Sequence, residues 1–189
     1  MLRASDRRPS LWKNGGGSTS EIAVSPHGAG LEDFDWRVSM ARVERDGPFS
    51  MFAGVDRVLT IVEGELILEV LGAPALKLDA SSPPRVFPGD APTFGRLPGG
   101  AVVDLNVMTR RGAFRADVTR IELNAARDVS PKGEALLIVL DGELDLRAPE
   151  GRARLGPRDA WRGQGGVWRL TPATSARVAL VEFVGVMRK

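Results

Sequence analysis

The sequence predicts an all-β fold built from many short strands. Glycine and proline, with 22 and 13 residues, recur along the 189-residue chain without gathering into a long linker. Between them lie short runs rich in aliphatic and β-branched residues, and some runs alternate apolar with polar side chains. Such runs are typical of strands, because successive side chains of a strand point to opposite faces of a sheet. No long window carries a helical stripe.

Two of the expected strands alternate cleanly. In residues 36–40, Arg37 and Ser39 share one face, and in residues 103–108 the shared polar face belongs to Asp104 and Asn106. A period of two predicts a half-buried strand, and the simplest interpretation of its polar face is exposure to solvent. Further strand-like segments cover residues 58–62, 66–70, 136–140 and 178–184.

An internal repeat predicts two related β lobes. Residues 61–68 resemble residues 139–146, and each segment joins an acidic residue to a glycine between two strand-like runs, which we interpret as hairpins. Downstream, residues 87–90 resemble residues 155–159, and each half then ends in an apolar strand. Because the motifs recur in the same order, we expect two lobes. Their predicted limits are residues 1–112 and 113–189.

Composition narrows the function classes. Cysteine and tyrosine are absent and His27 is the one histidine, so disulfides, thiolate nucleophiles and zinc–thiolate sites are excluded. The formal net charge is +2 and the arginines are scattered among acids, so we expect no nucleic-acid partner. Residues 1–10 lack the apolar segment of a secretory signal, and no apolar run is long enough to span a bilayer. We therefore expect a cytoplasmic protein without a membrane partner, with His27 on its surface.

The order of the repeated motifs resembles a cupin barrel. In that family the first motif places two histidines and a glutamate ahead of the turn glycine, where they hold a metal. The corresponding positions here are Met51, Ala53 and Arg57, and the later histidine falls near Val103 or Asp104. The resemblance therefore implies a cupin that uses neither a metal nor another cofactor. Since arginine binds carboxylates bidentately, Arg57 points to an anion site.

A narrower resemblance covers residues 12–111. The segments that resemble signatures of the HutD/Ves family are residues 12–23, 36–43, 47–50, 54–57 and 104–111. That family consists of two-lobed cupins, so the resemblance implies a bicupin, with two double-stranded β-helix (jelly-roll) barrels packed in one compact unit. One branch is encoded with histidine-degradation genes, which implies a role in histidine utilisation and a ligand such as formylglutamate or urocanate. The other branch is linked to stress and cold response, so the pathway stays open.

The alternation, the glycine-rich loop and the resemblance together select the candidate ligand-binding residues. Asn14 precedes three glycines, whose amides either approach an anion or form a tight turn. Asp56 either orients Arg57 or is a plain turn acid. Arg37 and Asn106 become neighbours of Arg57 if their strands are adjacent in one barrel. The candidate set is Asn14, Thr19, Glu21, Arg37, Ser39, Asp56, Arg57, Asp104, Asn106 and Arg110.

These residues predict a metal-independent protein that binds a small acidic metabolite. The alternative is a metal-free enzyme, an isomerase or lyase acting beside a carboxylate, with Glu21 or Asp104 as the base. No catalytic residue is assigned, because the usual nucleophiles and acid–base groups are nearly absent. Trp161 and Trp168 are expected to cover the mouth of the second barrel or the lobe interface. Cupins often pair through their sheets, so the resemblance also allows a homodimer.

Overall fold

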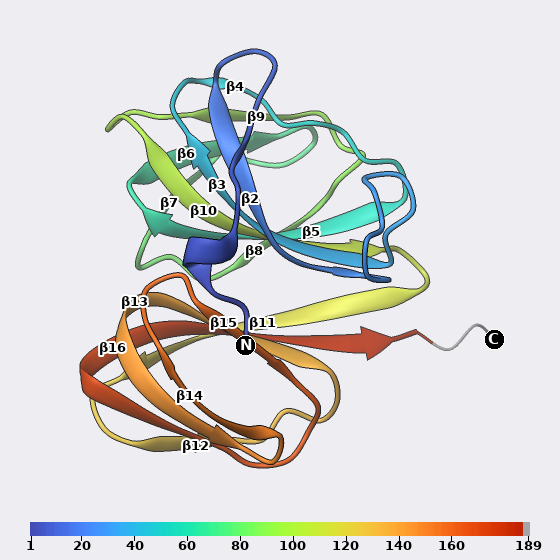
Figure 1. Ribbon diagram of the computed structural model, residues 1–189. Coiled ribbons are helices and arrows are strands. Elements are labelled where there is room, and N and C mark those ends of the chain that lie inside the picture. The colour runs from blue at the N-terminus through green and yellow to red at the C-terminus, as the bar shows by residue number, and fades with distance from the viewer. Residues whose placement is uncertain (187–189) are drawn as a thin grey trace. The chain divides into compact units, whose positions relative to one another are not determined.

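A computed structural model describes residues 1–186, and strands connected by turns and loops account for nearly all of its regular structure (Figure 1). The only helical element among the described residues is a short 3-10 helix, Ala4–Asp6. No helix in this part of the chain has the length and apolar character required to cross a membrane. The all-β prediction is confirmed.

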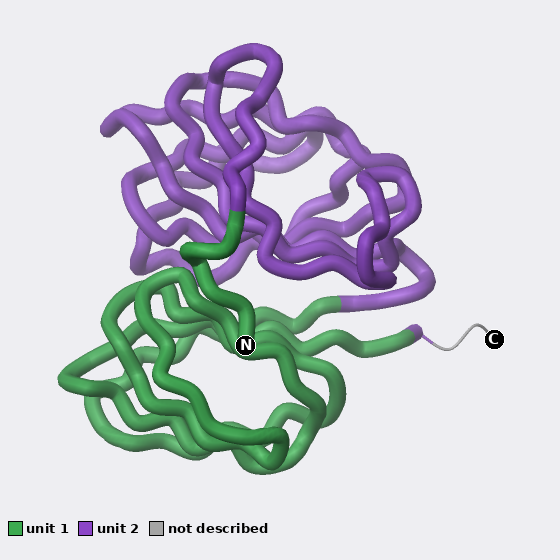
Figure 2. The backbone as a smooth tube through the Cα atoms, in the orientation of Figure 1, with its two compact units in different colours: residues 1–7, 116–185 green, residues 8–115, 186–189 purple. Residues whose placement is uncertain are grey.

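The chain divides into two compact units (Figure 2). We call residues 8–115 with Val186 the N-terminal unit, and residues 1–7 with 116–185 the C-terminal unit. This division differs from the predicted one, which follows residue 112 and keeps the N-terminus in the first lobe. Residues 1–7 instead join the second set of strands, because Leu2 pairs with Ala160 and the backbone N–H of Ala4 donates to the Asp159 carboxylate at 2.8 Å.

Two antiparallel sheets form the N-terminal unit. The first has the strand order β1 (Ser10–Leu11), β2 (Gly17–Ser25), β3 (Trp36–Val43), β10 (Val102–Arg110), β5 (Val55–Glu63), β8 (Arg85–Pro88). The second has the order β4 (Gly47–Pro48), β9 (Thr93–Arg96), β6 (Glu65–Val70), β7 (Leu76–Asp79). The segments expected as strands at residues 36–40, 58–62, 66–70 and 103–108 all lie within these elements.

The strands of the C-terminal unit belong to one antiparallel sheet. Its main order is β11 (Phe114–Leu123), β16 (Trp168–Gly185), β13 (Ala135–Ala148), β14 (Gly151–Leu155), while β12 (Arg127–Val129) pairs with β16 and β15 (Ala160–Gly163) pairs with β13. Trp161 and Trp168 are 8% and 0% exposed within the hydrophobic core of this unit. The expectation that they cover a barrel mouth or lobe interface is therefore wrong, since both side chains fill the core.

The repeated acid–glycine motifs are not hairpins. Gly64, with φ +83°, lies where the chain leaves β5 in the first sheet and enters β6 in the second, and the two strands do not pair with each other. Gly142, with φ +78°, bends the continuous strand β13, next to a shift in its register with β16. A glycine with positive φ is compatible with a corner between sheets as well as with a hairpin turn. The acid–glycine motif therefore did not distinguish the two, and the predicted hairpins are wrong.

The two units repeat the same local contacts around these corners. A Cβ atom at Gly64 would lie 2.7 Å from the carbonyl oxygen of Ala101, and one at Gly142 would lie 2.3 Å from that of Ser175. The next motif also repeats, because the N–H of Gly89 donates to Val55 and the N–H of Arg158 donates to Val139, each at 2.7 Å. Arg158 has φ +68°, so it keeps a backbone conformation that favours glycine.

Two apolar clusters pack on the inward face of the first sheet of the N-terminal unit, one against the second sheet and the other against the loops before β3 and β5. Along the inward face of β10, Val102 belongs to one cluster and Met108 to the other. Asp104 and Asn106 occupy the inward positions between them, because alternate residues of a strand share a face. The interior of this unit therefore contains a polar layer bounded by hydrophobic packing at both ends.

Candidate functional site

Strand register brings most of the candidate residues onto one face of the first sheet. Across β2, β3 and β10, Glu21 pairs with Ser39 and Ser39 pairs with Asn106. At the next position of β10 on the same face, Met108 pairs with Arg37 of β3 on one side and with Arg57 of β5 on the other. This face looks toward the second sheet, since residues that share it on β5 pack against β6. We call Glu21, Arg37, Ser39, Arg57, Asp104 and Asn106 the interior polar cluster.

Arg57 is a buried cation held by aromatic rings and neutral acceptors. The residue is 6% exposed. Its guanidinium carbon lies 4.9 Å from the ring centroid of Phe49 and 5.3 Å from that of Phe87. Nε donates to Oδ1 of Asn106 and Nη1 donates to the carbonyl of Ser50, each at 3.3 Å. Burial lowers the pKa of Arg57 to about 10 against the attraction of Asp104. Its charge is thus desolvated without a carboxylate bonded to it.

Asp104 is the second buried ionisable group of the cluster. It is 3% exposed at the centre of the sheet, where its register partners are Ala41 on β3 and Ile61 on β5. Burial raises the pKa of its carboxyl to about 7, and the nearby charge of Arg57 only partly opposes this effect. A carboxyl in this range exchanges its proton near neutral pH, which is the property required of an acid–base group or a switchable hydrogen-bond donor.

The cluster becomes more exposed toward β2. Arg37 donates from Nε to the Glu21 carboxylate at 2.8 Å, and the two side chains are 14% and 43% exposed. Ser39 is buried and lies 3.5 Å from Nη1 of Arg37. Thr19 occupies the same face of β2, in the row of Ala41, and accepts a hydrogen bond from the Trp12 indole at 2.8 Å. Solvent therefore reaches the cluster from the Glu21 side.

Three of the candidates take local structural roles away from this cluster. Asn14 accepts a hydrogen bond from the N–H of Gly16 at 3.0 Å inside the turn between β1 and β2, in agreement with the tight-turn alternative. Asp56 forms an ion pair with Arg111 at 2.8 Å and lies on the opposite face of β5 from Arg57. Arg110 donates to the backbone carbonyls of the loops before β3 and β5. These contacts stabilise turns and loops.

The two positions compared with cupin histidines lie outside the cluster. Met51 is 61% exposed and Ala53 is also exposed, in the loop that precedes β5. His27 is exposed after β2, as expected. Within residues 1–186, no three His, Cys, Asp or Glu side chains gather as a possible metal site. The polar groups of the cluster are two guanidiniums, an amide, a hydroxyl and two carboxyls, of which the Glu21 carboxyl is paired with Arg37.

Sequence reasoning missed the residues that hold Arg57 in place. Phe49 lies in the loop after β4, Ser50 contributes only its carbonyl, and Phe87 lies on β8 in register with Arg57. A backbone carbonyl such as that of Ser50 can belong to any residue type, so the sequence does not identify it as an acceptor. Phe87 had a detectable signal, since it is the first residue of the repeated segment 87–90, but only the register assigns its ring to Arg57.

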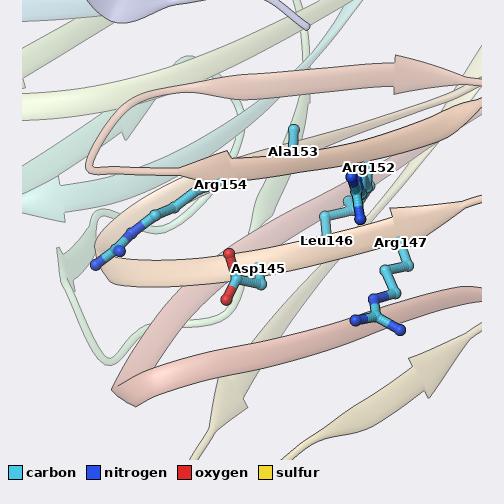
Figure 3. Close-up of a pocket in the computed structure, with 6 residues that line it drawn as sticks. All are labelled: Asp145, Leu146, Arg147, Arg152, Ala153 and Arg154. Atoms are coloured by element: carbon cyan, nitrogen blue, oxygen red, sulfur yellow. The ribbon is translucent and has the colours of Figure 1, made fainter.

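The C-terminal unit carries a different feature, a shallow depression of about 420 Å³ on the hairpin of β13 and β14 (Figure 3). Its lining side chains include Arg147 and Arg152, which are cross-strand partners, and Arg154, which bonds to Glu143 at 2.8 Å. These arginines are exposed, and Figure 3 shows them extending from the sheet surface. Exposed charges need no compensating ligand, whereas the buried Arg57 and Asp104 do, so we place the candidate site at the interior polar cluster.

Comparisons with known proteins agree with this architecture. A family model described as HutD matches residues 4–180. An uncharacterised 21.2 kDa protein from the hutC 3′ region of Pseudomonas putida is 34% identical over 97% of this chain and 96% of its own length. Protein Ves of Citrobacter koseri is 42% identical over 57% of this chain and 56% of its own.

Solved structures extend the comparison to three dimensions. HutD from Pseudomonas fluorescens SBW25 superposes with a TM-score of 0.82 at 30% identity, over 97% of both chains. A cupin 2 conserved barrel protein from Leptotrichia buccalis has a TM-score of 0.59 at 9% identity, over 93% of this chain and 95% of its own. The second similarity shows the fold alone, and that fold is a cupin fold.

Proposed function

Because this chain belongs to the HutD family, which is associated with histidine utilisation, we propose that it is a metal-independent cupin that binds a small carboxylate metabolite at the interior polar cluster. The observation that carries this proposal is the state of Arg57. Its guanidinium is buried, its pKa is lowered to about 10, and no carboxylate among residues 1–186 is bonded to it. Burying a charge without a partner is costly, and a ligand carboxylate would remove that cost.

The donors in the cluster suit one carboxylate. Asn106 accepts from Arg57 through Oδ1, which leaves its amide NH2 as a further donor. The remaining N–H groups of Arg57 are available for a bidentate contact, the geometry in which arginine recognises carboxylates most strongly. The pathway association favours formylglutamate and urocanate as ligands. The cluster supports no metal ligation, since it contains no histidine and one of its two carboxyls, Glu21, is paired with Arg37.

Thermal unfolding in the presence of candidate acids tests this function. N-formyl-L-glutamate or urocanate should raise the melting temperature of the purified protein, and glutamate and histidine serve as reference compounds. At about 100 times the dissociation constant, a ligand stabilises the native state by about 2.7 kcal/mol. The proposal is wrong if neither pathway acid raises the melting temperature at any pH between about 5.5 and 9.

A matched pair of variants localises the ligand. Arg57→Met should weaken binding by about 100-fold or more, because the carboxylate loses its buried, charge-assisted partner. Arg111→Met is the control, since Arg111 is 44% exposed in the same unit and pairs with Asp56 and Asp90 away from the cluster. Arg111→Met should bind the acid like the wild type. Equal weakening in both variants would contradict the assignment.

One observation favours a second candidate function, a metal-free isomerase or lyase. Asp104 has a pKa raised to about 7 and lies beside the proposed carboxylate site, as a catalytic base would. Incubating formylglutamate or urocanate with the metal-free protein and following the mixture by proton NMR in D2O tests it. Deuterium exchange or a new product that is absent with Asp104→Asn would favour the enzyme over the binding protein.

A further inference from the structure

Asp104 is a buried carboxyl without a hydrogen-bond partner. Its side chain is 3% exposed and its cross-strand neighbours are apolar, and no residue in the described range 1–186 donates a hydrogen bond to it or pairs with it at ion-pair distance. An ionised carboxylate in such surroundings is expensive, whereas the neutral acid costs much less. The neutral acid, however, carries an O–H group that itself needs an acceptor.

Arg57 is aligned so that a bound anion would supply this acceptor. The hydrogen bond from its Nε to Asn106 holds the guanidinium near the inward position of β10 that neighbours Asp104. The charges of Arg57 and Asp104 each shift the pKa of the other group. A ligand carboxylate on Arg57 would therefore come close to Asp104. Two carboxyl groups that share a buried site favour keeping one proton between them, as in paired catalytic aspartates.

The charges around Asp104 lead to the same conclusion. The charged groups on the elements that face it are Arg57 on β5, Arg37 on β3 and Glu21 on β2. Arg37 and Glu21 form an ion pair with no net charge, although the charge of Arg37 still helps to lower the pKa of Arg57. Arg57 and one ligand carboxylate then balance only if Asp104 is uncharged. With Asp104 ionised, the same buried site would hold an uncompensated negative charge.

We propose that Asp104 recognises the ligand as a neutral acid, donating a hydrogen bond from its carboxyl O–H to the bound carboxylate, so that each ligand binds together with one proton taken from solvent. This inference rests on the proposed function, and it adds a specificity rule. The site selects a group that accepts hydrogen bonds from Arg57, Asn106 and Asp104 together. Carboxylate meets that requirement, whereas an amine or ammonium group does not.

Isothermal titration calorimetry with N-formyl-L-glutamate, or with urocanate if that is the acid that binds, tests the proton count. Titrations at about pH 8.5 in buffers of different ionisation enthalpy measure the protons taken up per ligand, and neither acid has a group that titrates near this pH. We expect uptake approaching one proton. Affinity should fall about tenfold for each pH unit above the pKa of Asp104 in the free protein.

Asp104→Asn removes the titratable carboxyl and keeps a hydrogen-bond donor at the same position. The amide NH2 replaces the carboxyl O–H, so this variant should bind within a few-fold of the wild-type affinity at about pH 6, with no proton uptake and no loss of affinity up to about pH 9. Asp56→Asn is the matched control, because Asp56 lies on β5 but on the opposite face from Arg57. It should retain the wild-type proton uptake.

The outcomes separate the two proposals. Binding to the wild type without proton uptake, or uptake that persists in Asp104→Asn, overturns the role of Asp104 and leaves the carboxylate site standing. If neither acid binds the wild type even at about pH 6, where Asp104 keeps most of its proton, the binding function and this inference fall together.

Discussion

Replacing Asp104 with asparagine should make the ligand-free protein more stable above neutral pH. The carboxyl has a pKa of about 7 in the fold and 3.8 in an unconstrained chain. The folded state therefore holds the proton more tightly than the unfolded state between these values. Below the lower value both states are protonated, and above the higher value both are ionised.

The size of the effect follows from that difference. One pKa unit corresponds to about 1.36 kcal/mol, so ionisation of Asp104 costs the folded state about 4 kcal/mol by the time the pH exceeds 7. This cost builds up as the pH rises from 3.8 to about 7 and stays constant above it. An asparagine of nearly the same volume carries no such cost at any pH. Wild type and variant should thus diverge as the pH rises.

Urea unfolding followed by circular dichroism measures the difference. Free energies of unfolding are compared between wild type and Asp104→Asn at about pH 4.5, 6, 7 and 8.5, so that titrations common to both cancel. The gain in the variant should grow by several kcal/mol across this range and level off above pH 7. Asp56→Asn, on the opposite face of β5, loses the ion pair with Arg111 and should differ from the wild type by a nearly constant amount across this range.

Parallel stability profiles for wild type and Asp104→Asn would refute the reasoning, because they would show that Asp104 ionises equally in both states. A variant that is less stable at high pH would show that the ionised carboxylate stabilises the fold through Arg57. Either result would also remove the physical basis for proton-linked ligand binding.

Three further predictions concern other parts of the chain. Gly142→Ala should destabilise the protein by about 2 kcal/mol or more, because a Cβ atom there would lie 2.3 Å from the Ser175 carbonyl oxygen at φ +78°. Thermal melts measure this loss, and the control Gly72→Ala, which has open space around the added Cβ atom, should lose only about 1–2 kcal/mol. Arg110→Ala should cost about 1–2 kcal/mol in urea unfolding, since it removes hydrogen bonds to the carbonyls of Glu32, Phe34 and Ala53, yet carboxylate affinity by calorimetry should not change. Arg147→Glu should stabilise the C-terminal unit by about 0.5 kcal/mol at low salt, because Arg147 pairs in register with both Arg152 and Arg169; a gain that persists unchanged in high salt would contradict this electrostatic origin.

The alternation of Arg37 with Ser39 and of Asp104 with Asn106 was sufficient to predict strands and shared faces. It was not sufficient to predict which face is buried, because period two looks the same for a polar interior and a polar surface. Ser39 and Asp104 are buried at 1% and 3% exposure, contrary to the simplest interpretation of their strands. These side chains are enclosed because this face of the first sheet is turned toward the second sheet, and that arrangement depends on residues distant in sequence.

The site shows the same limit. The adjacency of Arg37 and Asn106 was expected if their strands paired, and β3 does pair with β10. The contacts that desolvate Arg57 come from a loop, a backbone carbonyl and the edge strand β8, none of which has a periodic signal. Gly64 shows the opposite case, in which a strong local signal fitted two structures, a hairpin and a corner between sheets.

The central position of β10 also has a consequence for how the N-terminal unit folds. β2, β3 and β5 are synthesised before it, yet β3 and β5 are joined only through β10, which registers with both. Until residues 102–110 insert, two strand edges stay unpaired and open to association with other chains. Asp104 and Asn106 arrive with that same strand. Completion of the sheet and assembly of the site are therefore one event, because the insertion of β10 pairs β3 and β5 and brings the last two residues of the cluster beside Arg57.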